Sequence, residues 1–427
     1  MKVDRSMLSY SLGALTALSC ALVPLDSFGL PRVSLTSGTP CLACHTNPSG
    51  GGGRTELGWG SMSNVGAIDY YDVGMTPDET NMILDGLMSI GMDVRVQGAR
   101  LGKPTIDEAT QETVYPDMTF FPMQIQPYIT VKPYEGVTLY GTYLPGPESF
   151  RDGQGPCDPV FPGMACYEAF AMYEPSGAWP TVRAGVFQPA LGIRHDDHTM
   201  MIRGDANDRR RPLIAPNYAE AGVEVISQPV TWFRTELGLY TPDKINATLN
   251  DGVKTANLDP VAYNIRVAFT PYIAIPYEVE TEDDGFGDFD DFGDEPETED
   301  YIVNSWFGAS AYGSGDFLML NGFVGLGIHE GVSFVAETSY SKRTIDYTTL
   351  NYLIGVWYTP WDWVSAALRY ERGTTYLAND KTASVEAVVA GLEFFPMPYM
   401  EIRPEYRLVT TDAYKFGHAT LQIHFFY

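Results

Sequence analysis

Residues 417–427 read GHATLQIHFFY, and most of this stretch alternates between apolar and polar side chains. One face would carry Ala419, Leu421, Ile423, Phe425 and Tyr427, and the opposite face His418, Thr420, Gln422 and His424. A period of two residues predicts a β-strand with one apolar face. The same period recurs from about residue 90 onward, for example over 261–269 and 400–408, where the polar face carries charges. We therefore expect an all-β protein.

The composition limits the class of protein. The 427 residues include 54 acidic and 27 basic side chains, which give a net charge of −27. This charge argues against a nucleic-acid partner, because few basic side chains are present to neutralise phosphates. The 42 glycines, 27 tyrosines and 21 phenylalanines, with only 19% charged residues, indicate a sheet protein rich in turns and aromatic side chains.

The alternating strands favour a membrane barrel over a soluble sandwich. Strands with one apolar and one charged face suit a transmembrane β-barrel, with lipid outside and water inside. A soluble sandwich would instead bury the apolar face as its core. The aromatic content favours the membrane, as does the apolar last strand that ends at Tyr427. That ending resembles the signal by which outer-membrane barrels are recognised for insertion, so we expect the outer membrane of a Gram-negative bacterium.

The period predicts about sixteen antiparallel strands between residues 90 and 427. We expect them near 90–101, 119–132, 136–144, 166–174, 180–188, 217–227, 231–241, 260–273, 300–313, 316–328, 331–342, 346–359, 362–372, 382–395, 398–409 and 417–427. Most connections after even-numbered strands are short, and several after odd-numbered strands are long. Outer-membrane barrels have short periplasmic turns and longer extracellular loops. The alternation therefore supports sixteen strands or a nearby even number.

Residues 1–29 are predicted to be an export signal. A weakly cationic start precedes an apolar stretch over 7–25, and small residues follow at Ser27 and Gly29. This order is typical of a secretory signal peptide. The alternative, a single membrane anchor, is less consistent with Pro24 and Asp26, which end the apolar stretch early.

The sequence Cys41-Leu42-Ala43-Cys44-His45 has the form C-x-x-C-H, the attachment motif of c-type haem. Two thiols at this spacing add to the two vinyl groups of one porphyrin, and the adjacent imidazole becomes the proximal iron ligand. A thioredoxin-like redox pair is the rival interpretation, but no βαβ pattern surrounds the motif. We therefore predict one covalent haem c held by Cys41, Cys44 and His45.

Residues 30–89 are expected to form the haem segment. Glycines 50–53 exclude a helix there, whereas Thr76 and Pro77 predict the start of one short helix that runs past Met82. Only about 60 residues separate the signal from the first strand. Because that is small for an independent domain, we expect the segment to pack against the barrel or to plug its lumen.

Two further cysteines, Cys157 and Cys166, lie in a stretch of turn-forming residues. In an oxidising compartment we expect them to form a disulfide that stabilises this loop. A metal-binding pair is the alternative, although no histidine lies nearby in the sequence.

Two long insertions interrupt the strands. The insertion at 189–216 follows the fifth strand and contains His195, His198 and several arginines. In sixteen-stranded porins the corresponding loop folds inward, so resemblance predicts a constriction. The two histidines could bind a cation or approach the haem, or the charges could pair within an ordinary extracellular loop.

The insertion at 278–300 carries 13 acids and no base. By the strand count it lies on the periplasmic side, where it could steer a basic cytochrome to the haem. It could equally be a solvated spacer. Calcium binding is a further alternative, but the regular ligand spacing of a known loop is absent.

The order of these parts resembles the fused monohaem c-type cytochrome–porins of the outer membrane, known from iron-oxidising bacteria. The parts are the signal, one motif at Cys41, Cys44 and His45, a short haem segment, and a barrel ending in an aromatic residue. The resemblance covers the whole chain in architecture, but only the haem motif in specific residues. The segment 185–192 also resembles the strand-to-loop segment of phosphate-selective porins.

This resemblance implies electron transfer across the outer membrane. Electrons from a donor, with extracellular Fe(II) as one candidate, would reach a periplasmic c-type cytochrome or another soluble carrier. The alternative is a porin for small solutes with an accessory haem-binding N-terminus. A haem enzyme such as a peroxidase would need acid–base residues that the sequence does not identify.

The distal haem ligand has several candidates. We favour Met75, because methionine raises the reduction potential relative to a second histidine. The other candidates are Met62, Met82 and Met88 in the haem segment, His195 and His198 in the loop, and His418 and His424 on the last strand.

Overall fold

The fold is described by a computed structural model. It covers residues 31–39, 41–48, 50–63, 65–68, 82–84, 86–100, 105–106, 109–110, 113–114, 117–143, 165–176, 179–195, 200–207, 213–214, 217–250, 256–278, 298–328, 331–344, 346–378 and 380–427. The predicted signal 1–29, residues 279–297 of the acidic insertion, and Met75, Cys157 and His198 lie outside these described residues.

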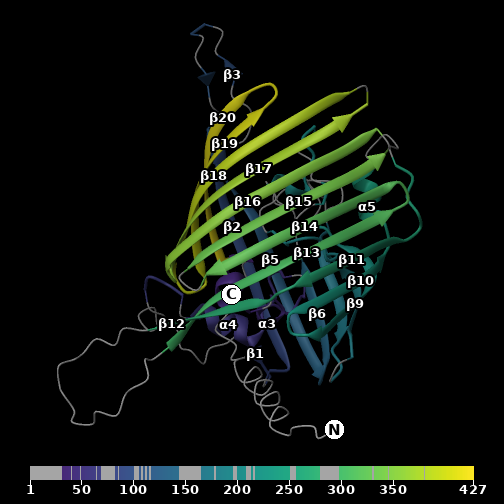
Figure 1. Ribbon diagram of the computed structural model, residues 1–427, viewed down its shortest axis with the longest axis vertical. Helices are drawn as coiled ribbons and strands as arrows, with labels where there is room; N and C mark the ends of the chain where they lie inside the picture. The colour runs from purple at the N-terminus through teal and green to yellow at the C-terminus, as the bar shows by residue number, and fades with distance from the viewer. Residues whose placement is uncertain are drawn as a thin grey trace, which may run out of the picture.

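Most of the described chain forms one closed antiparallel barrel (Figure 1). Its strands are β2 (Met88–Arg100), β5 (Met118–Tyr134), β6 (Val137–Tyr143), β7 (Tyr167–Tyr173), β8 (Thr181–Phe187), β9 (Glu220–Val230), β10 (Phe233–Tyr240), β11 (Ala262–Phe269), β12 (Tyr272–Glu278), β13 (Thr298–Ser314), β14 (Phe317–Ile328), β15 (Val332–Thr344), β16 (Tyr347–Trp361), β17 (Val364–Leu377), β18 (Lys381–Met397), β19 (Met400–Thr411) and β20 (Lys415–Phe426).

The barrel closes because β2 pairs with both β5 and β20. Strands β11 and β12 both pair with β13, so they act as one strand interrupted at 270–271. Counted in this way, β2, β5–β11 and β13–β20 make sixteen strands within the described chain. The predicted number of strands is therefore confirmed.

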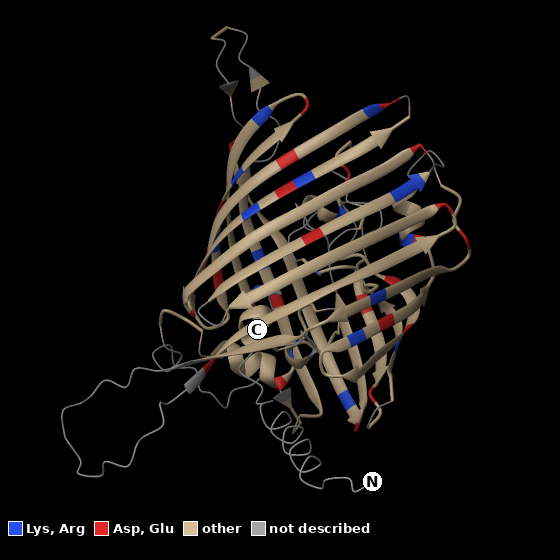
Figure 2. Ribbon diagram, viewed as in Figure 1, with Lys and Arg blue, Asp and Glu red and all other residues tan. Residues whose placement is uncertain are grey.

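Apolar side chains cover the outside of the wall. On β10, the side chains of Leu237 and Leu239 are 50% and 61% exposed. Glu236, which directly precedes Leu237 on the same strand, is 2% exposed and faces the lumen. On β20, His424 and Gln422 are buried, whereas Phe425 and the following terminal residue Tyr427 are exposed, as the sequence predicted. Figure 2 shows that charged residues occupy isolated positions on the strands, separated by long uncharged stretches. An exposed apolar outer surface around a polar interior is typical of an outer-membrane barrel.

The connections distinguish the two ends of the barrel. Short turns join β5 to β6, β9 to β10, β16 to β17 and β18 to β19. The chain that follows β2, β6, β8 and β10 is longer and leaves the opposite end. Because the acidic insertion joins β12 to β13, its two ends lie at the short-turn, periplasmic end, as predicted. In the described residues no helix is both long and apolar enough to cross a membrane.

The N-terminal segment lies inside the periplasmic half of the barrel. It consists of α2 (Pro31–Ser37), α3 (Cys41–Cys44) and α4 (Glu56–Ser63), and Figure 1 shows α3 and α4 within the lower end of the lumen. Helix α2 packs against β13, β14 and β15. A side chain at Gly327 of β14 would lie only 2.3 Å from the carbonyl oxygen of Leu35. Glycine at this position allows the helix to contact the wall directly.

A cluster of buried side chains fills the lumen on the side of the barrel formed by β5–β14. It combines wall residues with residues of the loop after β8 and of helix α5 (Asp243–Leu249). Its members are Tyr128, Tyr140, Phe170, Met172, Phe187, Leu191, Leu213, Ile214, Tyr218, Tyr240, Ile245, Leu249, Ala256, Ala262, Tyr312, Phe317 and Met319. The lumen on this side is therefore a packed core.

The structure corrects three expectations about local structure. The helix predicted to run past Met82 is wrong there, because Met82 and Ile83 form strand β1 and pair with β2. The N-terminal segment holds three short helices in its described part, where one was expected. Near the acidic insertion the strands are longer than predicted, since β12 reaches Glu278 and β13 begins at Thr298. Backbone pairing extends the strands where the side-chain pattern no longer alternates.

The orientation of the wall can be tested with an arginine on the lipid side. Leu368 is 58% exposed near the middle of β17. We expect Leu368→Arg to lower the free energy of unfolding in lipid vesicles by about 2–4 kcal/mol, because the charge enters hydrocarbon. The control is Leu84→Arg, which makes the same change in an exposed turn outside the barrel strands. Equal stability of the two variants would contradict the assigned orientation.

Candidate functional site

The glycine-rich stretch after the C-x-x-C-H motif passes close to the barrel wall. A Cβ at Gly53 would lie 2.4 Å from a ring carbon of Tyr140, and one at Gly52 would lie 2.8 Å from a carboxylate oxygen of Asp93. No side chain fits at such distances without displacing its neighbour. The glycines therefore allow the N-terminal segment to lie against β2, β5 and β6.

A buried polar junction holds this stretch to the wall. The Asn47 amide donates to Glu168 at 2.9 Å and accepts a hydrogen bond from Arg183 at 2.6 Å. Arg183 also forms an ion pair with Glu224 at 2.6 Å, and both side chains are fully buried. Buried charges are tolerated only when paired and hydrogen-bonded, and breaking such a pair is costly.

The loop after β8 joins the same junction from the extracellular side. Arg194 donates to the carbonyl of Gly50 at 2.9 Å and forms an ion pair with Glu168 at 3.3 Å. Glu168 therefore contacts the N-terminal segment through Asn47 and the loop through Arg194. The two insertions into the lumen, which come from opposite ends of the barrel, meet at this carboxylate.

The rest of the described loop crosses the lumen to the far wall. Gly192 and Ile193 donate backbone hydrogen bonds to Ser310 and Glu337, and His195 contacts Glu337 at 2.8 Å. The backbone of Met201 donates to Glu371 on β17, at the start of the 3-10 helix η2 (Met201–Arg203). The predicted inward fold of this loop is confirmed for its described residues.

The C-x-x-C-H motif lies within the N-terminal segment, inside the lumen. Residues Cys41–Cys44 form the helical turn α3, and His45 follows it directly. Cys44 is 1% exposed and His45 is 5% exposed. Two thiols at this spacing followed by an imidazole are the donor set that c-type haem requires, so the residues fit the group.

An aromatic contact fixes the end of the segment near the last strand. The Trp59 ring stacks on Tyr399 at 4.2 Å and meets Tyr427 edge-on at 4.6 Å. The Tyr399 hydroxyl donates to the carbonyl of Trp59 at 3.2 Å. Burial raises the pKa of Tyr399, which lies in the turn after β18, to about 12, so the hydroxyl keeps its proton. Met62, one of the distal candidates, is buried in the same cluster.

The other candidate residues are dispersed. Met82 and Met88 lie in strands β1 and β2, and His195 is held by Glu337 on the wall. His418 and His424 belong to β20, where His424 is buried beside Glu401. Met75 and His198 lie outside the described residues, as does Cys157, so the predicted disulfide with Cys166 stays a prediction. Within the described chain, no three His, Cys, Asp or Glu side chains are grouped to hold a metal ion.

Sequence reasoning missed the polar junction. Glu168 and Arg183 occupy single inward positions on β7 and β8, and Asn47 follows the C-x-x-C-H motif in a stretch predicted only as a loop. The sequence signal for these two residues was a single charged side chain on a short, otherwise uncharged strand, which indicates a charge that faces the lumen. Nothing in the sequence indicated which charges would meet across the lumen.

No family model matches this chain, and no curated protein matches it. Solved outer-membrane structures resemble it at low identity. The channel DcaP of Acinetobacter baumannii has a TM-score of 0.48 at 10% identity, covering 79% of this chain and 96% of that one. An anion-selective porin from Comamonas acidovorans has a TM-score of 0.46 at 11% identity, covering 79% and 98%. OpdK from Pseudomonas aeruginosa has a TM-score of 0.41 at 9% identity, covering 79% and 98%.

These likenesses are too weak to assign a function or a family. The architecture therefore rests on the strand pairing and exposed apolar wall of the chain itself. On those grounds the protein is an outer-membrane β-barrel of sixteen strands with a porin-like fold.

Proposed function

We propose that the protein is an outer-membrane channel for small solutes, whose lumen is narrowed by the loop after β8 and closed from the periplasmic side by the N-terminal segment. A sixteen-stranded barrel is wide enough to leave an aqueous channel when nothing fills it. The observation that carries the proposal is the junction at Glu168, where the loop and the N-terminal segment bind the same carboxylate.

This junction supports a closed resting state that can open. Besides the polar junction, the segment is held by an ion pair between Arg32 and Glu393 at 2.5 Å and by the aromatic contact at Trp59. These contacts add to the packing of helix α2 against β13, β14 and β15. To open the channel, the N-terminal segment would have to exchange these contacts for contacts with water. A ligand that binds the open state better than the closed state would shift the equilibrium between them.

Removing the shared carboxylate should favour the open state. We expect Glu168→Gln in the full chain to raise the open probability in planar bilayers about tenfold, because hydrogen bonds to a charged group contribute about 1.5–3 kcal/mol. The matched control is Glu386→Gln, which removes a carboxylate from an outward-facing ion pair with Arg372. If neither the full chain nor Glu168→Gln conducts any solute or ion, the channel proposal is wrong.

A second candidate function is electron transfer across the outer membrane through one c-type haem. The observation that favours it is the burial of Cys44 and His45, which lie at and directly after the helical turn α3 inside the lumen. Cys41 and Cys44 would form the thioethers and His45 the proximal bond to iron. When bound, the haem would supply one-electron chemistry in a site shielded from lipid by the wall.

The partners of this second function stay proposals. A donor such as extracellular Fe(II) would approach from the side of the long loops. A periplasmic c-type cytochrome or another soluble carrier would accept electrons at the end where the acidic insertion begins. The distal ligand is also open, with Met75 as our candidate; His195 would first have to leave Glu337.

Haem attachment has a direct test. We expect the mature protein from a host with cytochrome c maturation to carry one haem per chain, and Cys44→Ser to lose the normal two-thioether attachment. Intact mass and the pyridine haemochrome spectrum measure this. Cys166→Ser is the matched control, because it changes a cysteine outside the motif and should keep the haem. A wild-type chain without covalent haem would eliminate the second function and leave the channel proposal untouched.

A further inference from the structure

Strands β12 and β13 extend beyond the periplasmic end of the wall as a two-stranded ribbon (Figure 1). In the described chain, β13 pairs with β14 only from Val303 onward, whereas it pairs with β12 back to Thr298, which lies opposite Glu278. On the other side, β10 pairs with β11 as far as Phe269 and does not reach β12. Within the described residues β12 therefore has one strand neighbour, and its other edge is open.

The hydrogen bonds beside the ribbon show which backbone groups of β12 face the open edge. The Ser305 N–H donates to the carbonyl of Pro271 at 3.0 Å, across the pair with β13. The Thr270 N–H donates in the opposite direction, to the turn between β9 and β10, at 2.8 Å. Along an antiparallel strand, successive residues direct their backbone groups to alternate sides. The even-numbered residues of β12 therefore direct theirs to the open edge.

The open edge offers a short row of hydrogen-bonding groups. Tyr272 and Ala274 present both an N–H and a carbonyl, whereas Pro276 presents a carbonyl only. Because an N–H at Pro276 would have faced the open edge, the proline removes no bond between β12 and β13. Proline on an edge strand limits its pairing with other strands. Here it ends the row after two residues, so the edge suits a short partner strand.

Both faces of the ribbon expose apolar side chains. Ile273 and Ile275 are 58% and 48% exposed on one face, and Tyr272 is 43% exposed on the other. A two-stranded ribbon is marginally stable in water unless further strands or packing cover its apolar face. A third strand along β12 would cover these side chains and bond to the open edge.

The ribbon leads into the most acidic part of the chain. The sequence 278–300, which begins at the end of β12, holds 13 acids and no base. Asp300, which lies opposite Pro276 in the ribbon, is exposed. This charge attracts a basic partner and repels an acidic one.

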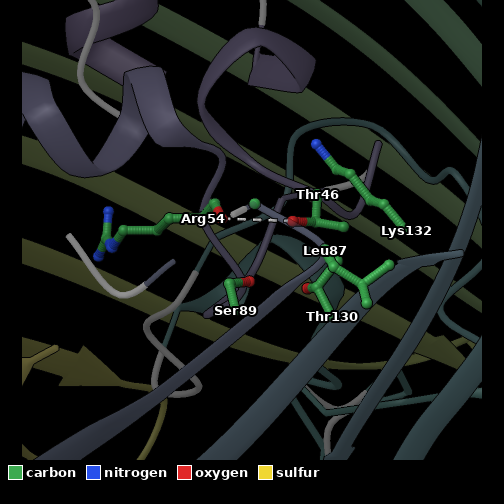
Figure 3. A pocket seen from close by; sticks show the side chains of 7 residues that line it. Thr46, Arg54, Leu87, Ser89, Thr130 and Lys132 are labelled. Atoms are coloured by element: carbon green, nitrogen blue, oxygen red, sulfur yellow. Dashed lines mark hydrogen bonds between the residues drawn. The ribbon is translucent and has the colours of Figure 1, made fainter. Parts of the chain in front are cut away.

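The ribbon is accessible from the periplasm, whereas the neighbouring part of the lumen is closed. Where the N-terminal segment meets β2 and β5, the side chains leave no room between them for even a water molecule. Thr46 and Arg54 of the segment lie there beside Ser89 and Thr130 of the wall (Figure 3). A periplasmic protein therefore meets a closed surface at this contact and an open strand edge at the ribbon.

We propose that the open edge of β12 binds an extended segment of a periplasmic protein, in which apolar side chains alternate with basic ones. The segment would add one strand to the sheet, the binding mode known as β-augmentation. Its backbone would pair with Tyr272 and Ala274. Its apolar side chains would pack beside Ile273 and Ile275, and its basic side chains would be attracted by the acidic insertion. Neither proposed function uses this surface.

The probe is a fluorescently labelled synthetic peptide of six residues that alternates lysine and valine. Its binding to the full chain in nanodiscs is measured by fluorescence anisotropy, with empty nanodiscs as the blank. We expect Ala274→Pro to weaken binding about tenfold, because it removes one backbone donor from the open edge. Ala274→Val is the matched control, since it keeps the N–H and should bind like the wild type. Neither change removes a hydrogen bond between β12 and β13.

Two further peptides separate backbone pairing from attraction by charge alone. A peptide that alternates glutamate and valine should bind about tenfold more weakly at low salt, because it carries the same charge as the insertion. A lysine–valine peptide with every backbone nitrogen methylated keeps the charge but cannot donate to the edge, so it should also bind weakly.

Several outcomes would overturn the proposal. They are absence of binding of the lysine–valine peptide to the wild type, equal binding to Ala274→Pro and Ala274→Val, and equal binding of the methylated peptide. A loss of oligomeric mass in Ala274→Pro would also overturn it, because a second copy of the chain would then occupy the edge. The assay uses neither conductance nor haem, so its result is independent of both proposed functions.

Discussion

The structure depends on the closure of a sixteen-stranded sheet in lipid. Every backbone polar group within the hydrocarbon must be paired inside the wall, and the pairing of β2 with β20 removes the last two edges. A circle of this size encloses more space than its own inward side chains can fill. The interior must therefore hold either water or other parts of the chain. In the described part of this protein, the N-terminal segment and the loop after β8 occupy the lumen.

The inserted chain comes from both ends and is fixed both by apolar packing and by charge. Arg32 binds Glu393 from the N-terminal side, and the loop after β8 contacts Glu337 and Glu371 on the far wall. The two insertions meet at Glu168. Buried ion pairs add little net stability but are costly to break singly, because breaking one leaves an uncompensated buried charge.

The two candidate functions use the same segment in different ways. For a channel, the N-terminal segment is a barrier held by the polar junction and by Trp59. For electron transfer, the same segment places Cys44 and His45 in a site that the wall separates from lipid.

The sequence by itself determined the wall. The period of two residues specifies which side chains face lipid, and it locates strands such as β20 without any knowledge of their neighbours. The positions of the C-x-x-C-H motif and of the inward loop were also readable, because both depend on local order along the chain. Only the tertiary structure decided what meets inside the lumen. Asn47, Glu168 and Arg194 come together only after the sheet has closed. The strand β1 at Met82, where a helix was predicted, likewise forms because β2 offers its backbone for pairing.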